Sequence, residues 1–114
     1  MHLPRDAMLL RIFCGESDKY KGKPLCEAIV LKARDLHMAG ATVLRGPLGF
    51  GKSSHLHTSK LTHISDDLPL VIEIVDTEEK IQSFLPTIEE MLGSGLVTME
   101  KAQVLRYGLG ADGT

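Results

Sequence analysis

The chain has 114 residues, of which 43% are hydrophobic and 25% are charged, a composition typical of one folded domain. A formal net charge of −2, with two Tyr, three Phe and no Trp, argues against a nucleic-acid-binding protein, because such proteins need a basic surface or aromatic stacking platforms. No apolar run reaches the roughly 18 residues that cross a bilayer, and the first residues lack the features of a signal peptide. We therefore expect residues 1–114 to form a single cytoplasmic domain in which Cys14 and Cys26 are free thiols.

The first part of the chain predicts a strand, a helix and a second strand. Residues 7–14 (AMLLRIFC) are an apolar run of strand length. Pro24 can occupy the first turn of a helix, where its missing N–H costs nothing. Apolar residues then recur at helical spacing over residues 25–38, and Gly40 is the expected end of this helix. Residues 41–45 (ATVLR) predict a short strand.

The second part of the chain predicts a further strand and a further helix. Residues 68–76 (LPLVIEIVD) are the most β-rich run in the sequence, and residues 60–64 are expected to pair briefly as a strand before it. Asp76 or Thr77 is the expected N-cap of the helix that follows. This helix carries an apolar stripe typical of packing against a sheet, made by Ile81, Phe84, Leu85, Ile88, Met91 and Leu92.

The end of the chain contains several structure-breaking residues. Pro86 lies within the second helix and predicts a kink or a break there. The glycine-rich turn Gly93–Gly95 is expected to end the helix. Residues 96–107 predict a last strand that is bulged near Lys101. Residues 108–114 form a glycine-rich tail that we expect to be frayed.

The order of the predicted elements indicates the fold class. A strand-helix-strand unit is followed by a long glycine-rich loop, at about residues 46–60, and then by a second strand-helix-strand unit. This βαββαβ pattern is that of the α+β ferredoxin-like sandwich. Its four strands form an antiparallel sheet with two helices on one face. Because the other face needs cover, we expect the chain to associate with copies of itself.

The segment from Gly46 to Ser53 (GPLGFGKS) fits G-x-x-x-x-G-K-[ST], the P-loop of ATPases. Asp76, at the end of an apolar strand, imitates the aspartate that holds magnesium in such enzymes. A P-loop, however, must follow a parallel strand and open a helix. Residues 54–59 (SHLHTS) have no helical pattern, and the chain is short for a sheet built from several βα units. The sequence therefore argues against a P-loop ATPase.

The same segment still has the local properties of an anion-binding turn. Gly46, Gly49 and Gly51 permit positive φ and close approach of the backbone, so that successive amides could form an anion-binding nest. Arg45 and Lys52 add positive charge on either side of these glycines. The alternative is a flexible turn whose cations are solvated. The spacing by itself does not decide between the two.

Histidines and one glutamate are the remaining candidates for a ligand site. His55 and His57, with His63 nearby, suggest a metal site, but zinc needs at least three protein ligands and no cysteine lies close in the sequence. Histidines that are solvated or that contact a phosphate are favoured over metal ligands. Glu73 interrupts an apolar strand and is expected on its exposed face. If Glu73 faced a ligand cleft, its carboxylate could accept from a ribose hydroxyl or an exocyclic amine.

Several segments resemble one known family over nearly the whole chain, from about Met8 to Arg106. They are GESDKYKGKPLCEAIV, AGATVLRGPLGFG, DLPLVIEIVDTEEKI and GLVTMEKAQVL, in this order. Together they are similar to the domain-of-unknown-function 190 family, which resembles the PII nitrogen-regulatory signalling proteins. The resemblance implies a PII-like, ferredoxin-type homotrimer with an adenine nucleotide, AMP in particular, in the clefts between subunits. It also implies, more distantly, a membrane transporter as partner.

The resemblance further implies which residues contact the ligand. The turn Gly93–Gly95 would approach the phosphate from the neighbouring chain, and Arg106, a basic residue of the last strand, would do the same. The long loop would change shape and touch a protein partner. The loop is shorter than in PII proteins and lacks their modified tyrosine, and the scarcity of basic residues after the second helix agrees with a monophosphate. The residues implied to contact the phosphate or shape the cleft are Arg45, Gly46, Gly49, Phe50, Gly51 and Lys52.

Three functions remain as hypotheses at this point. The first is a regulatory protein that senses a nucleotide, needs no cofactor or metal and performs no catalysis. The second is a small hydrolase or transferase that uses the His55 and His57 loop on a phosphate substrate. The third is an assembly protein whose loop binds another protein and no small molecule.

Overall fold

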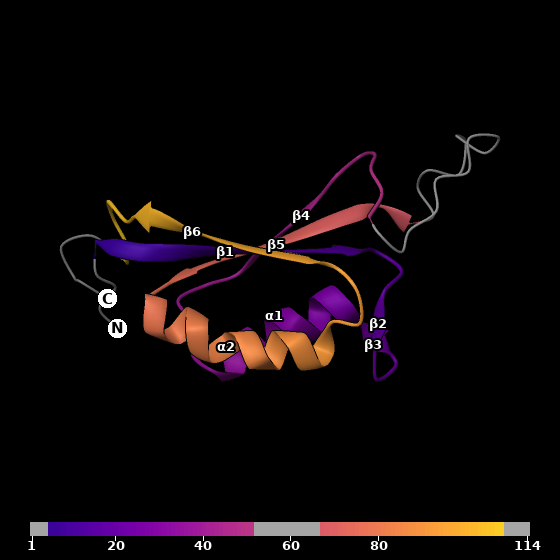
Figure 1. Ribbon diagram of the computed structural model, residues 1–114, viewed down its shortest axis with the longest axis horizontal. Coiled ribbons are helices and arrows are strands. Elements are labelled where there is room, and N and C mark those ends of the chain that lie inside the picture. The colour runs from indigo at the N-terminus through magenta and orange to yellow at the C-terminus, as the bar shows by residue number, and fades with distance from the viewer. Residues whose placement is uncertain (1–4, 52–66, 109–114) are drawn as a thin grey trace.

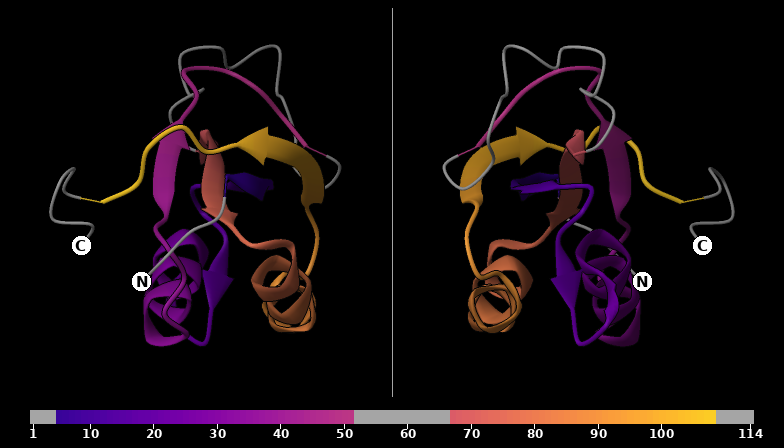
Figure 2. Two further views of the ribbon diagram at one scale, coloured as in Figure 1. Left: turned by 90° about the vertical axis from the view of Figure 1, so that its left-hand side faces the viewer. Right: turned by 90° about the vertical axis from the view of Figure 1, so that its right-hand side faces the viewer.

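The computed structural model describes residues 5–51 and 67–108, and Figure 1 shows their arrangement. Four strands form one sheet in the order β4-β5-β1-β6, with every neighbouring pair antiparallel. Both helices lie on one face of this sheet (Figures 1 and 2), which confirms the predicted α+β ferredoxin-like fold. In chain order the elements are β1 (Asp6–Gly15), β2 (Lys19–Tyr20), β3 (Lys23–Pro24), α1 (Leu25–Asp35), β4 (Thr42–Arg45), β5 (Pro69–Asp76), α2 (Glu78–Met91) and β6 (Leu96–Gln103).

The core lies between the sheet and the two helices. In β5 every second residue is buried, because alternate side chains of a strand point to opposite faces. The helices supply the other half of the core from the apolar stripes that their sequences predict. Large side chains with almost no exposed surface come from both layers: Leu10, Ile12, Ile29, Ile72, Ile74, Ile81, Phe84 and Ile88.

Helix α1 ends at Asp35, well before the predicted stop at Gly40. The end is made by His37, whose φ of 59° lies in the left-handed region that usually favours glycine. Its backbone N–H donates to Arg34 O, and Met38 N–H donates to Ala33 O, both at 3.0 Å. This is the Schellman pattern, so a glycine is not needed to end the helix.

Helix α2 begins as predicted but continues where a kink or break was expected. Thr77 is the N-cap, and its hydroxyl accepts from Lys80 N–H at 3.1 Å. The helix then runs through Pro86 to Met91. Proline removes the hydrogen bond to the residue four positions earlier, Gln82. Because both Pro86 and Gln82 are exposed, water can satisfy the unpaired carbonyl.

Strand β6 pairs with β1 without interruption, so the predicted bulge near Lys101 is wrong. The strand also ends at Gln103 and not near residue 107. The chain then leaves the edge of the sheet: Val104 N–H donates to Arg5 O at 2.6 Å, and the following residues cross the open face toward β4 (Figure 2). The hydroxyl of Tyr107 donates to Ala39 O at 2.8 Å, which fixes the far end of this crossing.

Asp76 is the one buried charged residue among the described residues, with 1% of its surface exposed. Its carboxylate accepts from Ala39 N–H at 2.8 Å and from Thr77 N–H at 2.7 Å. It therefore joins the segment before β4 to the start of α2. The resemblance of this aspartate to a magnesium-binding residue is explained by a structural role, because both carboxylate oxygens serve backbone amides.

We predict that Asp76→Ala lowers the free energy of unfolding by about 3 kcal/mol, since two hydrogen bonds to a charged acceptor are lost at roughly 1.5 kcal/mol each. Urea denaturation followed by circular dichroism measures the change. Asp35→Ala, at the exposed end of α1, is the matched control and should change stability by less than about 0.5 kcal/mol. Equal effects of the two substitutions would contradict the assigned role of Asp76.

Candidate functional site

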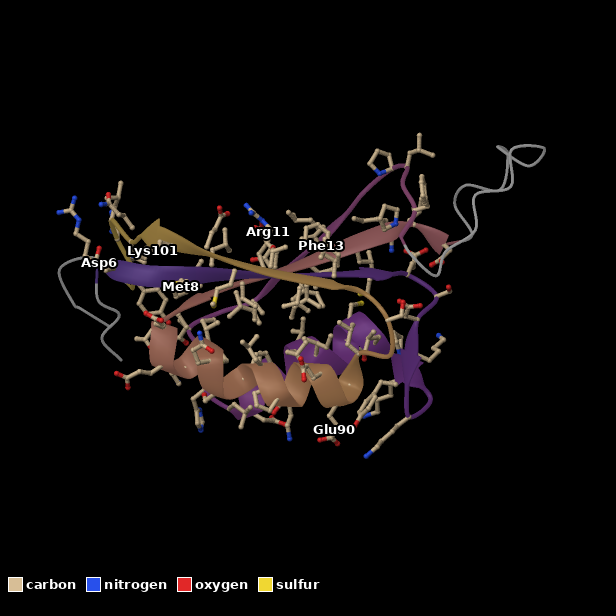
Figure 3. All side chains as sticks on the ribbon, viewed as in Figure 1. Asp6, Met8, Arg11, Phe13, Glu90 and Lys101 are labelled. Atoms are coloured by element: carbon tan, nitrogen blue, oxygen red, sulfur yellow. The ribbon has the colours of Figure 1, made fainter. Side chains whose placement is uncertain are left out.

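The sheet face opposite the helices has a charged centre. Arg11 and Phe13 of β1 point away from the helices (Figure 3). Arg11 Nε donates to Glu73 Oε2 at 2.9 Å, and Arg11 Nη1 donates to Glu100 Oε1 at 2.6 Å. The hydrogen bonds to Glu73 and then Glu100 raise the pKa of Arg11, so the guanidinium stays charged. Glu73 therefore lies on the open face, as its position in the strand predicts.

A cavity of about 580 Å³ lies on this open face, where the chain after β6 crosses the sheet. Its lining comes from all four strands of the sheet, from residues 39–41 before β4 and from the crossing segment. It brings together two residues that the sequence singled out, Glu73 and Arg106, so that one ligand could meet a carboxylate and a guanidinium. The lining residues used below are Leu9, Thr42, Glu73, Val75, Arg106 and Tyr107.

Arg45 ends β4 and does not line this cavity. Its Nη2 lies 2.5 Å from Glu16 Oε2, and 63% of the Arg45 side chain remains exposed. Glu16 belongs to the turn after β1 and had no part in the sequence-based site. The distance along β4 from Thr42, which lines the cavity, to Arg45 is about 10 Å, from roughly 3.3 Å per residue.

The glycine-rich turn packs around Pro69, the first residue of β5. A Cβ on Gly46 would lie 2.9 Å from Pro69 Cγ, and a Cβ on Gly49 would lie 3.1 Å from the same atom. The N–H of Gly46 donates to Pro69 O at 2.8 Å, so it already has an acceptor. Two glycines of the motif thus make room for a proline ring, whereas Gly51 has open space around it.

The turn after α2 lies at the opposite edge of the sheet from Arg45. A Cβ on Gly95 would lie 2.7 Å from Phe13 O, so the turn passes directly against β1. Leu96 pairs with Phe13 on one side of the sheet, and Arg45 pairs with Leu70 on the other. The turn after α2 and Arg45 thus lie at the same end of the strands but on opposite edge strands, separated by three strand spacings or about 14 Å.

The predicted site residues therefore fall into three groups within one chain. Glu73 and Arg106 share the cavity, whereas the resemblance assigned Arg106 to a neighbouring chain's ligand. Arg45 and the glycine-rich turn lie beyond one end of the cavity, with Phe50 70% exposed. Gly93 and Gly95 lie at the other edge. Sequence reasoning missed Glu16 and the cavity residues Leu9, Thr42, Val75 and Tyr107, because only the pairing of strands and the path of the chain after β6 identify them.

The structure also bears on the alternative assignments: a P-loop, a metal site and a membrane-spanning segment. The strand before the glycine-rich turn is antiparallel to its neighbour, whereas a P-loop follows a parallel strand. Lys52, Ser53 and the three loop histidines lie outside the described residues, as does the short strand predicted at 60–64. Within residues 5–51 and 67–108, no group of three or more His, Cys, Asp and Glu side chains is placed to hold a metal ion. Neither α1 nor α2 is long and apolar enough to cross a bilayer.

Cys14 is a free thiol near the end of β1. Burial raises the pKa of this thiol to about 12, and the carboxylate of Asp18 adds to the shift. A thiol nucleophile needs a lowered pKa, so the environment of Cys14 is the opposite of the one that activates a cysteine.

Comparison with known proteins identifies relatives and structural neighbours. The family model DUF190, described as an uncharacterized ACR, matches residues 7–104. A UPF0166 protein of Aquifex aeolicus (strain VF5) is 40% identical over 99 residues, which cover 85% of this chain and 91% of the relative.

Two solved structures share the fold at low sequence identity. A putative PII-like signaling protein from Thermus thermophilus matches with a TM-score of 0.60 at 17% identity, covering 91% of this chain and 93% of that one. The structure of CPII bound to ADP and bicarbonate, from Thiomonas intermedia K12, matches with a TM-score of 0.58 at 22% identity, covering 89% and 90%. These similarities show that the chain has the fold of PII-like proteins.

We predict that Cys14 of the folded protein is almost inert toward a thiol reagent such as Ellman's reagent at about pH 8. With a pKa of about 12, roughly one thiol in ten thousand is ionised at that pH. The Cys26→Ser variant leaves Cys14 as the sole reporter, and absorbance follows its reaction. The same variant in concentrated urea is the control and should react rapidly. Fast reaction of the folded variant would show that Cys14 is not shielded.

Proposed function

The chain belongs to the domain-of-unknown-function 190 family, and we propose that it is a PII-like regulatory protein that binds an adenine nucleotide without catalysing a reaction on it. AMP is the favoured nucleotide. The proposal requires no metal and no additional cofactor. It places the protein in the cytoplasm as a single domain, with signalling to a protein partner as its output.

The observation that carries this proposal is the cavity on the open face of the sheet. Its volume of about 580 Å³ is large enough for a small molecule, and it holds two of the candidates that the sequence named, Glu73 and Arg106. Glu73 can accept a hydrogen bond from a ribose hydroxyl or an exocyclic amine, and Arg106 can pair with a negative charge. Leu9 and Val75 add apolar surface suited to a base. The cavity therefore offers contacts for a base and a ribose, and Arg106 adds a positive charge beside them.

Arg45 and the glycine-rich turn extend the proposed site toward the phosphate. Strand β4 runs from Thr42, which pairs with Glu73 on the open face, to Arg45, which pairs with the buried Leu70 and therefore starts on the helix side of this edge strand. Gly49–Gly51 follow after residues 46–48. We therefore place the phosphate at the edge of β4, where the exposed Arg45 side chain can reach it. An arginine can bind phosphate through two parallel hydrogen bonds. Lys52 and Ser53 continue this segment in the sequence, and we assign them to the same end of the ligand. Few cations are available in all, which favours a monophosphate over a triphosphate.

A neighbouring copy of the chain would complete the site. Gly93 and Gly95 lie about 14 Å from Arg45, at the opposite edge of the sheet, so we assign them to the ligand of a neighbouring subunit. The open face also presents apolar side chains, with Leu44 and Leu96 exposed by 49% and 56%. Covering this face by self-association is favourable. We propose a homotrimer with the nucleotide between subunits.

The solved structures support the class of ligand and of function. One of them is of a protein bound to ADP and bicarbonate, and the other is described as a putative PII-like signaling protein. In our proposal the ligand shifts the population of conformations of the long loop, and a partner recognises the result. A membrane transporter is the proposed partner. The alternatives, an enzyme using His55 and His57 or a pure assembly protein, are outcomes of the first test below.

We predict that isothermal titration calorimetry detects AMP binding in the micromolar range without release of a product. Arg45→Ala should weaken this binding by about 1–3 kcal/mol through loss of a charge-assisted hydrogen bond. Arg34→Ala, at an exposed position of α1, is the control and should bind as the unmodified protein does. Product formation would support the enzyme hypothesis. The absence of binding heat with AMP, ADP, ATP and cyclic AMP would support the assembly-protein hypothesis.

We predict that size-exclusion chromatography with light scattering gives the mass of three chains. Phe13→Arg should dissociate the assembly, because it adds a positive charge to the open face beside Arg11 (Figure 3). Gln82→Arg, on the exposed side of α2, adds the same charge on the other side of the molecule and should leave the mass unchanged. A monomeric unmodified protein would overturn the intersubunit site.

A further inference from the structure

The turn between β1 and β2 contacts both ends of the chain segment that joins β4 to β5. At the far end of that segment, Glu16 N–H donates to Leu68 O at 2.8 Å, and Ser17 N–H donates to Asp67 Oδ1 at 3.0 Å. At the near end, the side chain of Glu16 meets Arg45. The backbone of Glu16 is therefore fixed by hydrogen bonds, and its carboxylate is held beside the guanidinium that we assign to the phosphate.

The ion pair between Glu16 and Arg45 is close but poorly aligned. Glu16 Oε2 is buried and, among the described residues, accepts no hydrogen bond, although Arg45 Nη2 is 2.5 Å away. The contact thus has the distance of an ion pair without the directionality of a hydrogen bond. A phosphate free to approach the exposed part of the guanidinium can form two aligned hydrogen bonds in its place.

We propose that Glu16 is the internal counter-ion of Arg45 and that a ligand phosphate binds by displacing it. This inference rests on the proposed function and specifies how the same site is regulated. Without ligand, the carboxylate neutralises the guanidinium. With ligand, Arg45 turns to the phosphate, and the buried oxygen of Glu16 loses its cation.

Competition of this kind sets the charge that a ligand must carry. A neutral or weakly charged ligand gains too little from Arg45 to break the ion pair, whereas a phosphate dianion gains more than a single carboxylate supplies. Glu16 therefore makes binding selective for the phosphate group. The backbone of Glu16 is hydrogen-bonded to Leu68, the residue before β5. Movement of Glu16 that follows release of its side chain therefore also displaces the start of β5.

The first test compares AMP with adenosine, which lacks the phosphate, by calorimetry on two variants. Glu16→Gln removes the competing charge at nearly constant size, and AMP affinity should rise about tenfold while adenosine affinity stays the same. Glu89→Gln, at an exposed position of α2, is the matched control and should change neither. Unchanged or weaker AMP binding by Glu16→Gln would show that Glu16 does not compete with the phosphate. Failure of the unmodified protein and of both variants to bind AMP would instead contradict the proposed function.

The second test measures the ion pair without any nucleotide. Phenylglyoxal modifies accessible guanidinium groups, and mass spectrometry reports the rate at each arginine. In the unmodified protein Arg45 should react more slowly than Arg34, which is exposed on α1. In Glu16→Gln the reaction at Arg45 should be severalfold faster, and the reaction at Arg34 should be unchanged. Equal rates at Arg45 in the two proteins would overturn the counter-ion role. This result would stand whether or not the protein binds a nucleotide.

Discussion

Ile12 and Ile72 pair across β1 and β5 and belong to the same buried core as Phe84 of α2, with almost no surface left exposed. Burial of each such side chain stabilises the fold by about 1.5–3 kcal/mol. Because side chains alternate along a strand, this packing also fixes what faces the other way: Arg11 and Glu73 must lie on the open side of the sheet. A shift of one residue in the pairing would bury these charges and expose the core, so the register is strongly determined.

Asp76 connects this core to the cavity. Its carboxylate accepts a hydrogen bond from Ala39 N–H, and the carbonyl of Ala39 accepts one from the Tyr107 hydroxyl. The rim of the cavity is thereby attached, through two hydrogen bonds, to a buried charge at the end of β5. A residue that resembles a magnesium ligand in the sequence thus has its effect on the site through the backbone.

The glycine-rich turn shows how one pattern can serve two purposes. Gly46 and Gly49 lie against Pro69 so closely that a larger residue would require the proline to move. This packing places Arg45 at the end of β4, within reach of Glu16. The glycines that suggested a phosphate nest therefore also have a structural role, and the charge selectivity that we propose for the site comes from the ion pair beside them.

The sequence by itself determined the fold class, the order of the two helices and the four strands of the main sheet, and the exposed position of Glu73, because these depend on local spacing of apolar residues. It did not predict the short β2–β3 hairpin, whose residues have the composition of a turn. It misplaced the end of α1 and the end of β6, since His37 adopts a left-handed conformation and the chain after Gln103 follows contacts with Arg5 and Ala39. Individual candidates for the site were named from residue type or, for Gly93, Gly95 and Arg106, from the family resemblance, but the way the structure groups them was not predicted. The cavity shared by Glu73 and Arg106 and the pairing of Arg45 with Glu16 were decided only by the tertiary structure, because strand register and the path of the chain bring together side chains that no local pattern relates.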